Sequence, residues 1–194
     1  MKNTSPTELQ FKIRSFHPAD VHACRRLYVD GLLGGKLAEN DTGLDIDDIE
    51  SAYMSTPANH FWVAELSAGT RAGEVVGMVG LIHPEPQSAE IRRLRVDHDF
   101  RRRGIGSALI EYSLKFCQDR GYLRIMLDTF IEREPAVKLF EKFHFRHSRT
   151  RAAHGKDLLY FYLDLYSITP AQDAGVRAPS DSSTPRQHVE PPKS

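Results

Sequence analysis

The sequence predicts an α/β (α+β) fold, a mixed and mostly antiparallel sheet of about six to seven strands with helices on both faces. Short runs in which apolar and polar residues alternate recur along the chain, as in half-buried strands. Between them lie longer segments whose apolar residues recur at helical spacing. Two strand-like runs, 60–66 and 74–84, are joined by a glycine-containing turn, which predicts a hairpin and therefore antiparallel pairing.

The first elements are one strand and two helices. Residues 11–16 alternate like a strand, and the segment 17–33 has Pro18 where a first helical turn begins. A second, shorter helix is expected over 45–55. The positions expected to face the core are Val21, Cys24, Leu27 and Tyr28 in the first helix and Ile46, Ile49 and Tyr53 in the second.

The same alternation continues after the hairpin. Strands are expected over 88–96 and 123–129, and the helix between them should end at Gly121, which suits a C-terminal cap. The buried stripe of that helix is expected to be Ile105, Ala108, Leu109, Tyr112 and Phe116. The last two elements are a helix over 134–143 and a strand over 157–165.

Length and composition fit one globular domain. The chain has 194 residues, and Lys plus Arg (26) equals Asp plus Glu (26), so the net charge indicates no class of partner. We expect a flexible N-terminus over 1–9, one folded domain over 10–166 and a disordered tail over 167–194. The tail is rich in proline and serine and has almost no large apolar residues.

Neither a membrane span nor a secretory segment is expected. No apolar run approaches about 18 residues, and the N-terminus lacks the apolar core of a signal peptide, so the expected compartment is the cytoplasm. Cys24 and Cys117 lie far apart among helical apolar positions. We expect two buried free thiols, which fits a reducing compartment.

Charge is distributed unevenly along the chain. The segment 36–50 contains six acidic residues and one lysine, whereas 91–103 contains six arginines and two aspartates. Two such zones would suit two subsites for groups of opposite charge. Two solvated faces are the alternative, and charge alone does not decide between them.

A candidate phosphate site lies at the start of the helix that follows residues 88–96. Gly104 and Gly106 let the main chain approach a ligand closely, and the first amides of a helix have no partner inside the helix. Arg101, Arg102 and Arg103 add charge and forked donors. The run is not a P-loop, because no Gly-Lys-Ser/Thr follows, and it lacks the third glycine of a dinucleotide-binding fingerprint. A simple tight turn is the alternative.

The run "RRRGIGSAL" (101–109) resembles the pyrophosphate-binding signature Q/R-x-x-G-x-G/A of the GNAT family of acetyl-CoA-dependent N-acetyltransferases. "LRV" (94–96) is similar to the preceding strand end, whose main chain pairs with the pantetheine arm in that family. "PAVKLFEKFHF" (135–145) resembles the family's later helix. The resemblance implies a GNAT-like fold, acetyl-CoA as co-substrate and an amine as acceptor. The residues that it implies for the cofactor are Leu94, Arg95, Val96, Arg101, Arg102, Arg103, Gly104, Ile105, Gly106, Ser107 and Arg133.

Acetyl transfer to an amine needs a proton acceptor, because a free alkylamine has a pKa of about 10.4. Glu90 is the candidate base. It lies four residues before Leu94, on a strand whose alternate residues share a face until a bulge intervenes. The resemblance agrees, because histone-acetylating members have a catalytic glutamate at this offset. A structural glutamate paired with Arg92 is the alternative. By resemblance, the Leu94 N–H donates to the thioester carbonyl, since family members splay this strand from the next.

The general acid departs from the resemblance. Many members have a tyrosine where this chain has Phe140, which has no proton to give. Arg133 also replaces a common asparagine, and His144 replaces the usual glycine. Tyr160 and Tyr162 on the last strand are candidate substitutes, as is water, although each tyrosine also suits a place in the core or on the sheet.

The sequence therefore predicts an N-acetyltransferase that moves acetyl from acetyl-CoA to a primary amine by direct attack. The acidic segment favours a small cationic amine or a peptide or protein amine as acceptor. The alternative is an acyl-CoA-binding sensor or interaction module without turnover. Nucleic acid is not an expected partner, because aromatic residues do not interleave the arginines, and no metal site is expected, because no His or Cys pair has ligand spacing. The exposed sheet edges would allow a homodimer without requiring one.

Overall fold

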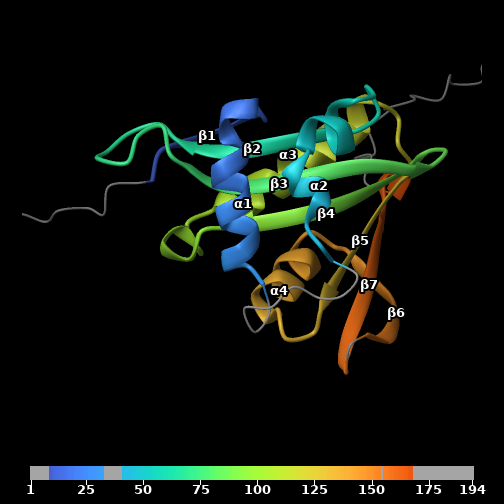
Figure 1. The fold of residues 1–194 in the computed structure, drawn as a ribbon. Coiled ribbons are helices and arrows are strands. Elements are labelled where there is room, and N and C mark those ends of the chain that lie inside the picture. Colours follow the sequence, from blue (N-terminus) through green and yellow to red (C-terminus); the bar gives the residue numbers. More distant parts are fainter. Residues whose placement is uncertain (1–8, 33–40, 154, 168–194) are drawn as a thin grey trace, which may run out of the picture.

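In the computed structural model, which describes residues 9–32, 41–153 and 155–167, the core of the fold is a seven-stranded sheet (Figure 1). The strand order is β1-β2-β3-β4-β5-β7-β6, and only the pair β4–β5 is parallel. The predicted class and hairpin are therefore confirmed. The strands are β1 (Phe11–Ser15), β2 (His60–Leu66), β3 (Val75–Glu85), β4 (Ser88–Val96), β5 (Arg124–Phe130), β6 (Arg146–Ala153) and β7 (Lys156–Asp164).

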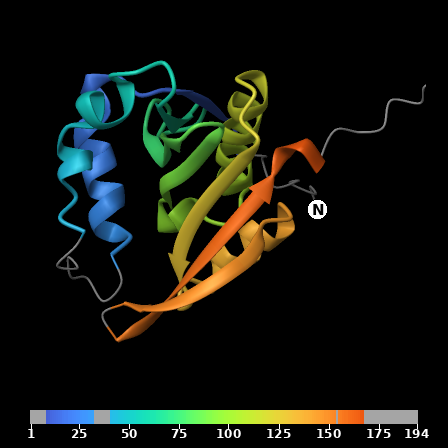
Figure 2. The same cartoon turned by 90° about the vertical axis from the view of Figure 1, so that its right-hand side faces the viewer.

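Helices cover both faces of the sheet, as predicted. One face carries α1 and α2, and the opposite face carries α3 and α4 (Figure 2). None of the helices in the described ranges is long and apolar enough to cross a membrane. The α-helices are α1 (Val21–Asp30), α2 (Leu44–Asp47), α3 (Ile105–Asp119) and α4 (Glu134–Lys142). Short 3₁₀ turns cover Pro18–Asp20, His98–Phe100 and Leu165–Ser167.

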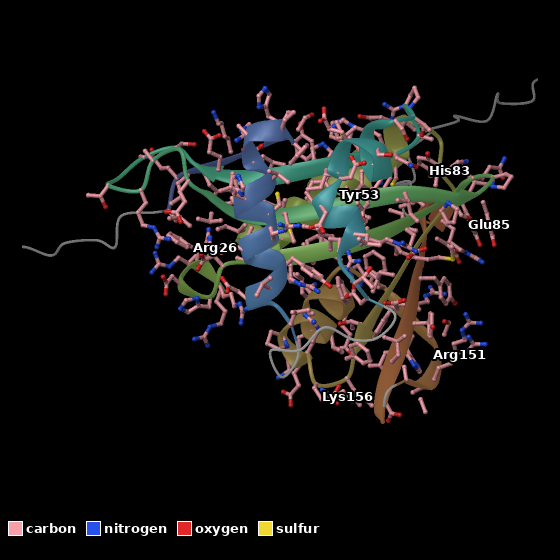
Figure 3. All side chains as sticks on the ribbon, viewed as in Figure 1. Arg26, Tyr53, His83, Glu85, Arg151 and Lys156 are labelled. Carbon is pink, nitrogen blue, oxygen red and sulfur yellow. The ribbon has the colours of Figure 1, made fainter. Side chains whose placement is uncertain are left out.

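Each face of the sheet has its own apolar core. Cys24 lies in the core under α1 and α2, and Cys117 lies in the core under α3. Both thiols are free, and burial raises the pKa of each to about 12, so they are inert at neutral pH. Tyr53 is buried on the α1 side of the sheet (Figure 3), and Phe61 and Trp62 are also core residues. These aromatic side chains build the core, as the sequence favoured.

The expected helix over 45–55 is divided into two short turns. The α2 turn ends at Asp47, Asp48 leaves helical conformation with φ −137°, and a π-helical turn follows over Glu50–Met54. The predicted apolar face is nevertheless correct, because Ile46, Ile49 and Tyr53 are all buried. Apolar spacing thus predicted which side chains face the core, but not the interruption of the backbone.

The buried stripe of α3 was predicted only in part. Ile105 and Leu109 are buried, Ala108 and Phe116 are half-buried, and Tyr112 is 46% exposed. Ile110, Ser113 and Cys117 are buried as well. The stripe therefore follows positions four residues apart from Ile105, and Tyr112 lies at its edge, where its ring meets the edge of Trp62. Gly121 caps the helix as predicted, with φ 72°.

Strand β6 was not among the predicted elements. Its residues, "RHSRTRAA", are exposed over Arg146–Ala152 and show no alternation of apolar and polar side chains. The strand exists because it pairs with β7, and it forms the outer edge of the sheet. Charged side chains such as Arg151 (Figure 3) disfavour pairing of this edge with a further strand.

Candidate active site

The largest structural irregularity of the sheet is the separation of β4 from β5. The two strands pair only at Ser88–Glu90 with 124–126 and then diverge, so the β4 edge beyond Glu90 has no strand partner on that side. A cavity of about 410 Å³ fills the divergence. It is lined by Asp41, Glu90, Ile91, Arg92, Arg93, Leu94, Arg95, Leu127, Asp128, Thr129, Phe130, Arg133, Ala136, Phe140, Ala153 and Leu158.

A bulge in β4 determines which side chains enter this cavity. Met78 of β3 faces Arg95 and Gly80 faces Arg92, so β4 has one extra residue between them. Arg93 lies in this bulge, and its backbone is left-handed with φ 55°. Before the bulge, Ala89 and Ile91 belong to the α3-side core, which leaves Glu90 and Arg92 for the α1 face.

After the bulge the alternation is reversed. Leu94 and Val96 now pack against the α3-side core, whereas Arg95 packs against Gly31 at the end of α1. Arg93 also points to the α1 face, where it forms ion pairs with Asp41 and Asp45. The bulge thus concentrates Glu90 and the arginines of β4 on one face of the sheet, and it leaves the Leu94 and Val96 side chains on the other.

Two carboxylates, Glu90 and Asp128, line the cavity. Glu90 accepts a hydrogen bond from Arg92 Nε at 2.7 Å, so the alternative of a glutamate paired with Arg92 is present in the structure. Asp128, on the facing strand, also lines the cavity and remains accessible to solvent there. Partial burial of the carboxylate raises the pKa of Asp128, and the negative charge of Glu90 raises it further.

Asp128 is the site residue that the sequence reasoning missed. The sequence did offer a signal, because Asp128 interrupts an otherwise apolar run in a predicted strand, "RIMLDTF". Asp128 lies near Glu90 because β4 and β5 pair in parallel with Glu90 opposite Met126, two residues before Asp128. That register joins segments far apart in the sequence, so no local pattern revealed it.

Three acidic side chains in α2 and just before it, Asp41, Asp45 and Asp47, are neutralised by arginines of the protein itself. Arg93 donates to Asp41 and to both carboxylate oxygens of Asp45, with each of the three distances at 2.7 Å. Burial would raise the pKa of Asp45, but hydrogen bonds from Arg93 and from Tyr53 lower it. Asp47 pairs with Arg25. These carboxylates therefore hold α2 against the sheet and α1 rather than forming an open acidic subsite.

Two arginines of the cavity lack such partners. Within the described part of the chain, neither Arg95 nor Arg133 forms an ion pair with a carboxylate. Burial lowers the pKa of Arg95 to about 9, and repulsion from Arg133 and Arg93 contributes. Burial also lowers the pKa of Arg133, which donates to the Gly31 carbonyl at 2.8 Å. Both guanidinium groups remain cationic at neutral pH.

The N-terminus of α3 presents a row of unused amides. Within the described residues, the N–H groups of residues 102–107 donate to no protein acceptor, and the first helical bond runs from Ala108 N to Gly104 O at 2.9 Å. Arg102 (φ 58°) and Gly104 (φ 90°) are left-handed, a backbone pattern that makes successive amides converge on an anion. Arg101, Arg102 and Arg103 are exposed around it.

Gly106 faces α4 rather than solvent. A Cβ at this position would lie 3.2 Å from Leu139 Cδ2 and 3.8 Å from Val96 Cγ2. A bulky residue at this position would therefore press directly on α4.

The family model described as the acetyltransferase (GNAT) family matches residues 22–145. The chain belongs to the GNAT family. The match includes the free amides of α3, the β4 bulge and all of α4, so it covers the elements that form the cavity.

Curated relatives of this GNAT chain match over half of its length. Rat N-acetylaspartate synthetase is 39% identical over 104 residues, which are 53% of this chain and 33% of the relative. Human N-acetyltransferase 8 is 35% identical over 107 residues, which are 53% of this chain and 45% of the relative. The chain therefore spans less than half of the length of either relative.

Solved GNAT structures share the fold. A GNAT acetyltransferase from Staphylococcus aureus Mu50 superposes with a TM-score of 0.68 at 18% identity, covering 80% of this chain and 99% of that one. A putative acetyltransferase from Salmonella typhimurium, solved with acetyl-CoA, gives 0.67 at 18% identity, covering 80% and 94%. At these identities the likeness establishes the fold alone.

The departures from the GNAT helix motif have clear places in the structure. Phe140 is 4% exposed and packs against Phe145 and Phe161, so the ring at the usual tyrosine position is a core residue as well as part of the cavity wall. Tyr160 is the strand neighbour of Asp128 but does not line the cavity. Its predicted role as general acid gains no support from this arrangement.

Proposed function

We propose that this GNAT chain is an N-acetyltransferase that moves an acetyl group from acetyl-CoA to a primary amine by direct attack. The observation that carries the proposal is the set of unused amides at the start of α3, beside a cavity that opens where β4 leaves β5. Free converging N–H groups at a helix N-terminus favour an anion such as a diphosphate.

The described residues fit the cofactor chemically. The amides of Gly104, Ile105, Gly106 and Ser107 would hold the diphosphate, and the exposed arginines 101–103 would add charge. The main chain of residues 94–96 would hold the pantetheine arm. When bound, acetyl-CoA supplies an activated acetyl group as a thioester.

The carboxylates would handle the proton of the amine. The acceptor must lose a proton to attack, and a carboxylate accepts it directly or through a water molecule. Asp128 has a raised pKa, to which the charge of Glu90 contributes. Glu90 itself accepts a hydrogen bond from Arg92. We therefore assign the base to this carboxylate pair, with Glu90 as originally expected and Asp128 as its added partner. The Leu94 N–H is proposed to orient the acetyl carbonyl.

The leaving thiolate has no tyrosine to protonate it among the described residues that line the cavity. Phe140 cannot donate a proton, so water is the proposed donor. A thiol with a pKa of about 8.5 is a good leaving group, and it does not need a strong acid at neutral pH.

The proposal is tested by calorimetric titration of acetyl-CoA and CoA, followed by a CoA-release assay over a panel of amines. Changing Arg102 and Arg103 to Gln should weaken CoA binding by about tenfold or more, because each charge-assisted contact contributes roughly 1.5–3 kcal/mol. The same change at Arg146 and Arg151 on β6 is the matched control and should leave CoA binding unaltered. Absence of CoA binding to the unmodified chain would contradict the proposal.

A second candidate function is supported by Phe140. A GNAT domain without the helix tyrosine could bind acyl-CoA as a sensor and not turn it over. Tight CoA binding with no CoA release across the amine panel would favour the sensor over the enzyme.

A further inference from the structure

We propose that Arg95 and Arg133 form an anion-binding subsite for the acceptor, so that the acceptors of this chain are amines that carry a carboxylate, of amino-acid or dipeptide size. The inference rests on the proposed acetyltransferase function and specifies its substrate class. It departs from two sequence-based expectations, a cationic acceptor and a cofactor-binding role for the Arg95 and Arg133 side chains.

Arg95 is the first observation. Its Nε atom is buried and has no hydrogen-bond partner among the described residues, and its Nη1 donates only to the carbonyl of the adjacent Leu94 at 2.9 Å. A buried charge without a counter-ion is costly, and a ligand that supplies the counter-ion recovers that cost. Because Arg95 lines the cavity, the missing partner can come from a bound molecule.

Arg133 is the second observation. Its guanidinium donates to the carbonyl of Gly31, and the Arg95 side chain packs under the same glycine, where an added Cβ would lie 2.5 Å from Nε. The two side chains are therefore held close to the same glycine at the end of α1. Burial lowers the pKa of both guanidinium groups, and the charge of Arg133 lowers the pKa of Arg95 further. An anion between them would relieve the repulsion.

The other charged side chains of the cavity are already paired. Arg92 binds Glu90, and Arg93 binds Asp41 and Asp45. A polycationic acceptor would find these acidic groups occupied and would meet the two unpaired arginines. An acceptor with a carboxylate would instead satisfy them, as forked guanidinium groups suit carboxylates.

The arrangement separates two ends of one cavity. The carboxylates of Glu90 and Asp128 lie near the point where β4 and β5 last pair, whereas Arg95 lies five residues further along β4. A strand rises by about 3.3 Å per residue, so the Cα atoms of Glu90 and Arg95 are at most about 17 Å apart. The amine would lie at the carboxylate end and the anionic group at the arginine end.

The first test uses matched acceptors with the unmodified chain. L-phenylalanine and glycylglycine are each compared with the corresponding C-terminal amide, L-aspartate is compared with its diamide, and spermidine serves as a polycationic probe. CoA release should favour the carboxylates by about 10- to 100-fold in kcat/KM, as expected for loss of a charge-assisted contact. In the presence of CoA, the carboxylates but not the amides should raise the thermal unfolding temperature. Preferred turnover of amides or spermidine would overturn the inference and leave the acetyltransferase proposal intact.

The second test changes the arginines. Arg95→Gln and Arg133→Gln should each raise KM for the carboxylate acceptor and bring its preference over the amide close to unity, while the Kd for acetyl-CoA stays within about twofold. Arg151→Gln, on the exposed strand β6, is the control. A raised Kd for acetyl-CoA with an unchanged acceptor preference would assign these arginines to the cofactor and overturn the inference. Lack of both CoA binding and CoA release would overturn the proposed function as well.

Discussion

At the scale of single residues, the site depends on two carboxylates in different surroundings. Glu90 has a cationic neighbour, Arg92, at hydrogen-bond distance, whereas Asp128 has no ion pair among the described residues and has a raised pKa. A raised pKa makes a carboxylate a stronger base in its ionised form. In the proposed reaction we therefore assign proton acceptance to Asp128, whose pKa the Glu90 carboxylate helps to raise.

Asp128→Asn should lower kcat by about 100-fold or more, because a positioned base contributes roughly 10²–10⁴-fold. In the unmodified chain, activity should increase as pH rises through the raised pKa of Asp128, since only the ionised form accepts a proton. The variant should lose this acidic limb of the pH–rate profile. Glu90→Gln is the matched comparison and should shift the limb to lower pH, because it removes the negative charge that raises the pKa of Asp128. An unaltered pH–rate profile in Asp128→Asn would show that Asp128 is not the proton acceptor.

Asp128 also has a consequence for stability, with a definite sign. Because its folded pKa lies above its ordinary value, its contribution to stability is fully present below that ordinary value and is lost as pH rises through the folded pKa. At neutral pH the ionised carboxylate therefore opposes folding. The chain retains it at this position, which is common for groups selected for chemistry rather than for stability.

At the scale of elements, the connections on either side of the helices adopt conformations that few residues tolerate. Gly104 begins α3 with φ 90°, and Gly121 ends it with φ 72°. His144, between α4 and β6, has φ 63° although it carries a side chain. GNAT relatives commonly have glycine there, and the structure gives the physical reason, since the turn requires a left-handed residue.

His144→Gly should stabilise the fold by about 0.5–1 kcal/mol. Relief of the left-handed strain contributes roughly 1–2 kcal/mol, and the greater freedom of glycine in the unfolded chain opposes part of it. Urea unfolding at neutral pH measures the difference. His144→Ala is the control and should destabilise, because alanine tolerates the left-handed region less well than histidine. A lower stability for His144→Gly than for the unmodified chain would contradict the prediction.

At the scale of the whole molecule, three aspartate–arginine pairs tie the α1 and α2 layer to the sheet. Asp20 pairs with Arg14 of β1, Asp45 with Arg93 of β4, and Asp97 with Arg26 of α1. Burial would raise the pKa of each aspartate, but the hydrogen bonds from its arginine lower it below 3.8. These pairs therefore stabilise the fold only while the carboxylates are ionised.

The free energy of unfolding should consequently fall as the solution is acidified. A group with a lowered folded pKa contributes stability above its unfolded value, and the contribution is lost as pH falls through the folded value. Urea midpoints at constant ionic strength should be similar at pH 7 and pH 5 and should decrease from about pH 4 to pH 2. Asp97→Asn should reduce both the stability at pH 7 and the size of the decrease. Midpoints that stay constant down to pH 2 would contradict this role for the pairs.

Local patterns in the sequence predicted most of the elements. Alternation identified the strands of the central sheet, and helical spacing identified α1, α3 and α4, because burial on one face acts on neighbouring residues. Strand β6 was missed, because its exposed residues obtain their conformation from pairing with β7. The division of the 45–55 helix was also missed. Asp45 accepts hydrogen bonds from Arg93 of β4, which is distant in the sequence, and the Ser51 N–H donates to Asp48 at the break.

The candidate site was predicted only in part. The amides of α3 follow from a local motif, and the structure shows them unused, as expected. Glu90 lies in the cavity as expected, but Asp128 joins it through a register between distant strands. The expected acidic subsite is instead paired with Arg93, a long-range contact that charge counting along the chain cannot detect.

By itself, the sequence determined the fold class, the order of most elements and the helix start suited to a phosphate, because each depends on residues close together in the chain. Only the tertiary structure decided which charged side chains of the cavity are paired with one another. The β4 bulge at Arg93 reverses the side-chain alternation, and Asp41 and Asp45 then neutralise Arg93 while Arg95 and Arg133 stay unpaired within the described residues. Whether a charge is available to a ligand depends on its three-dimensional partners, and those partners are distant in sequence.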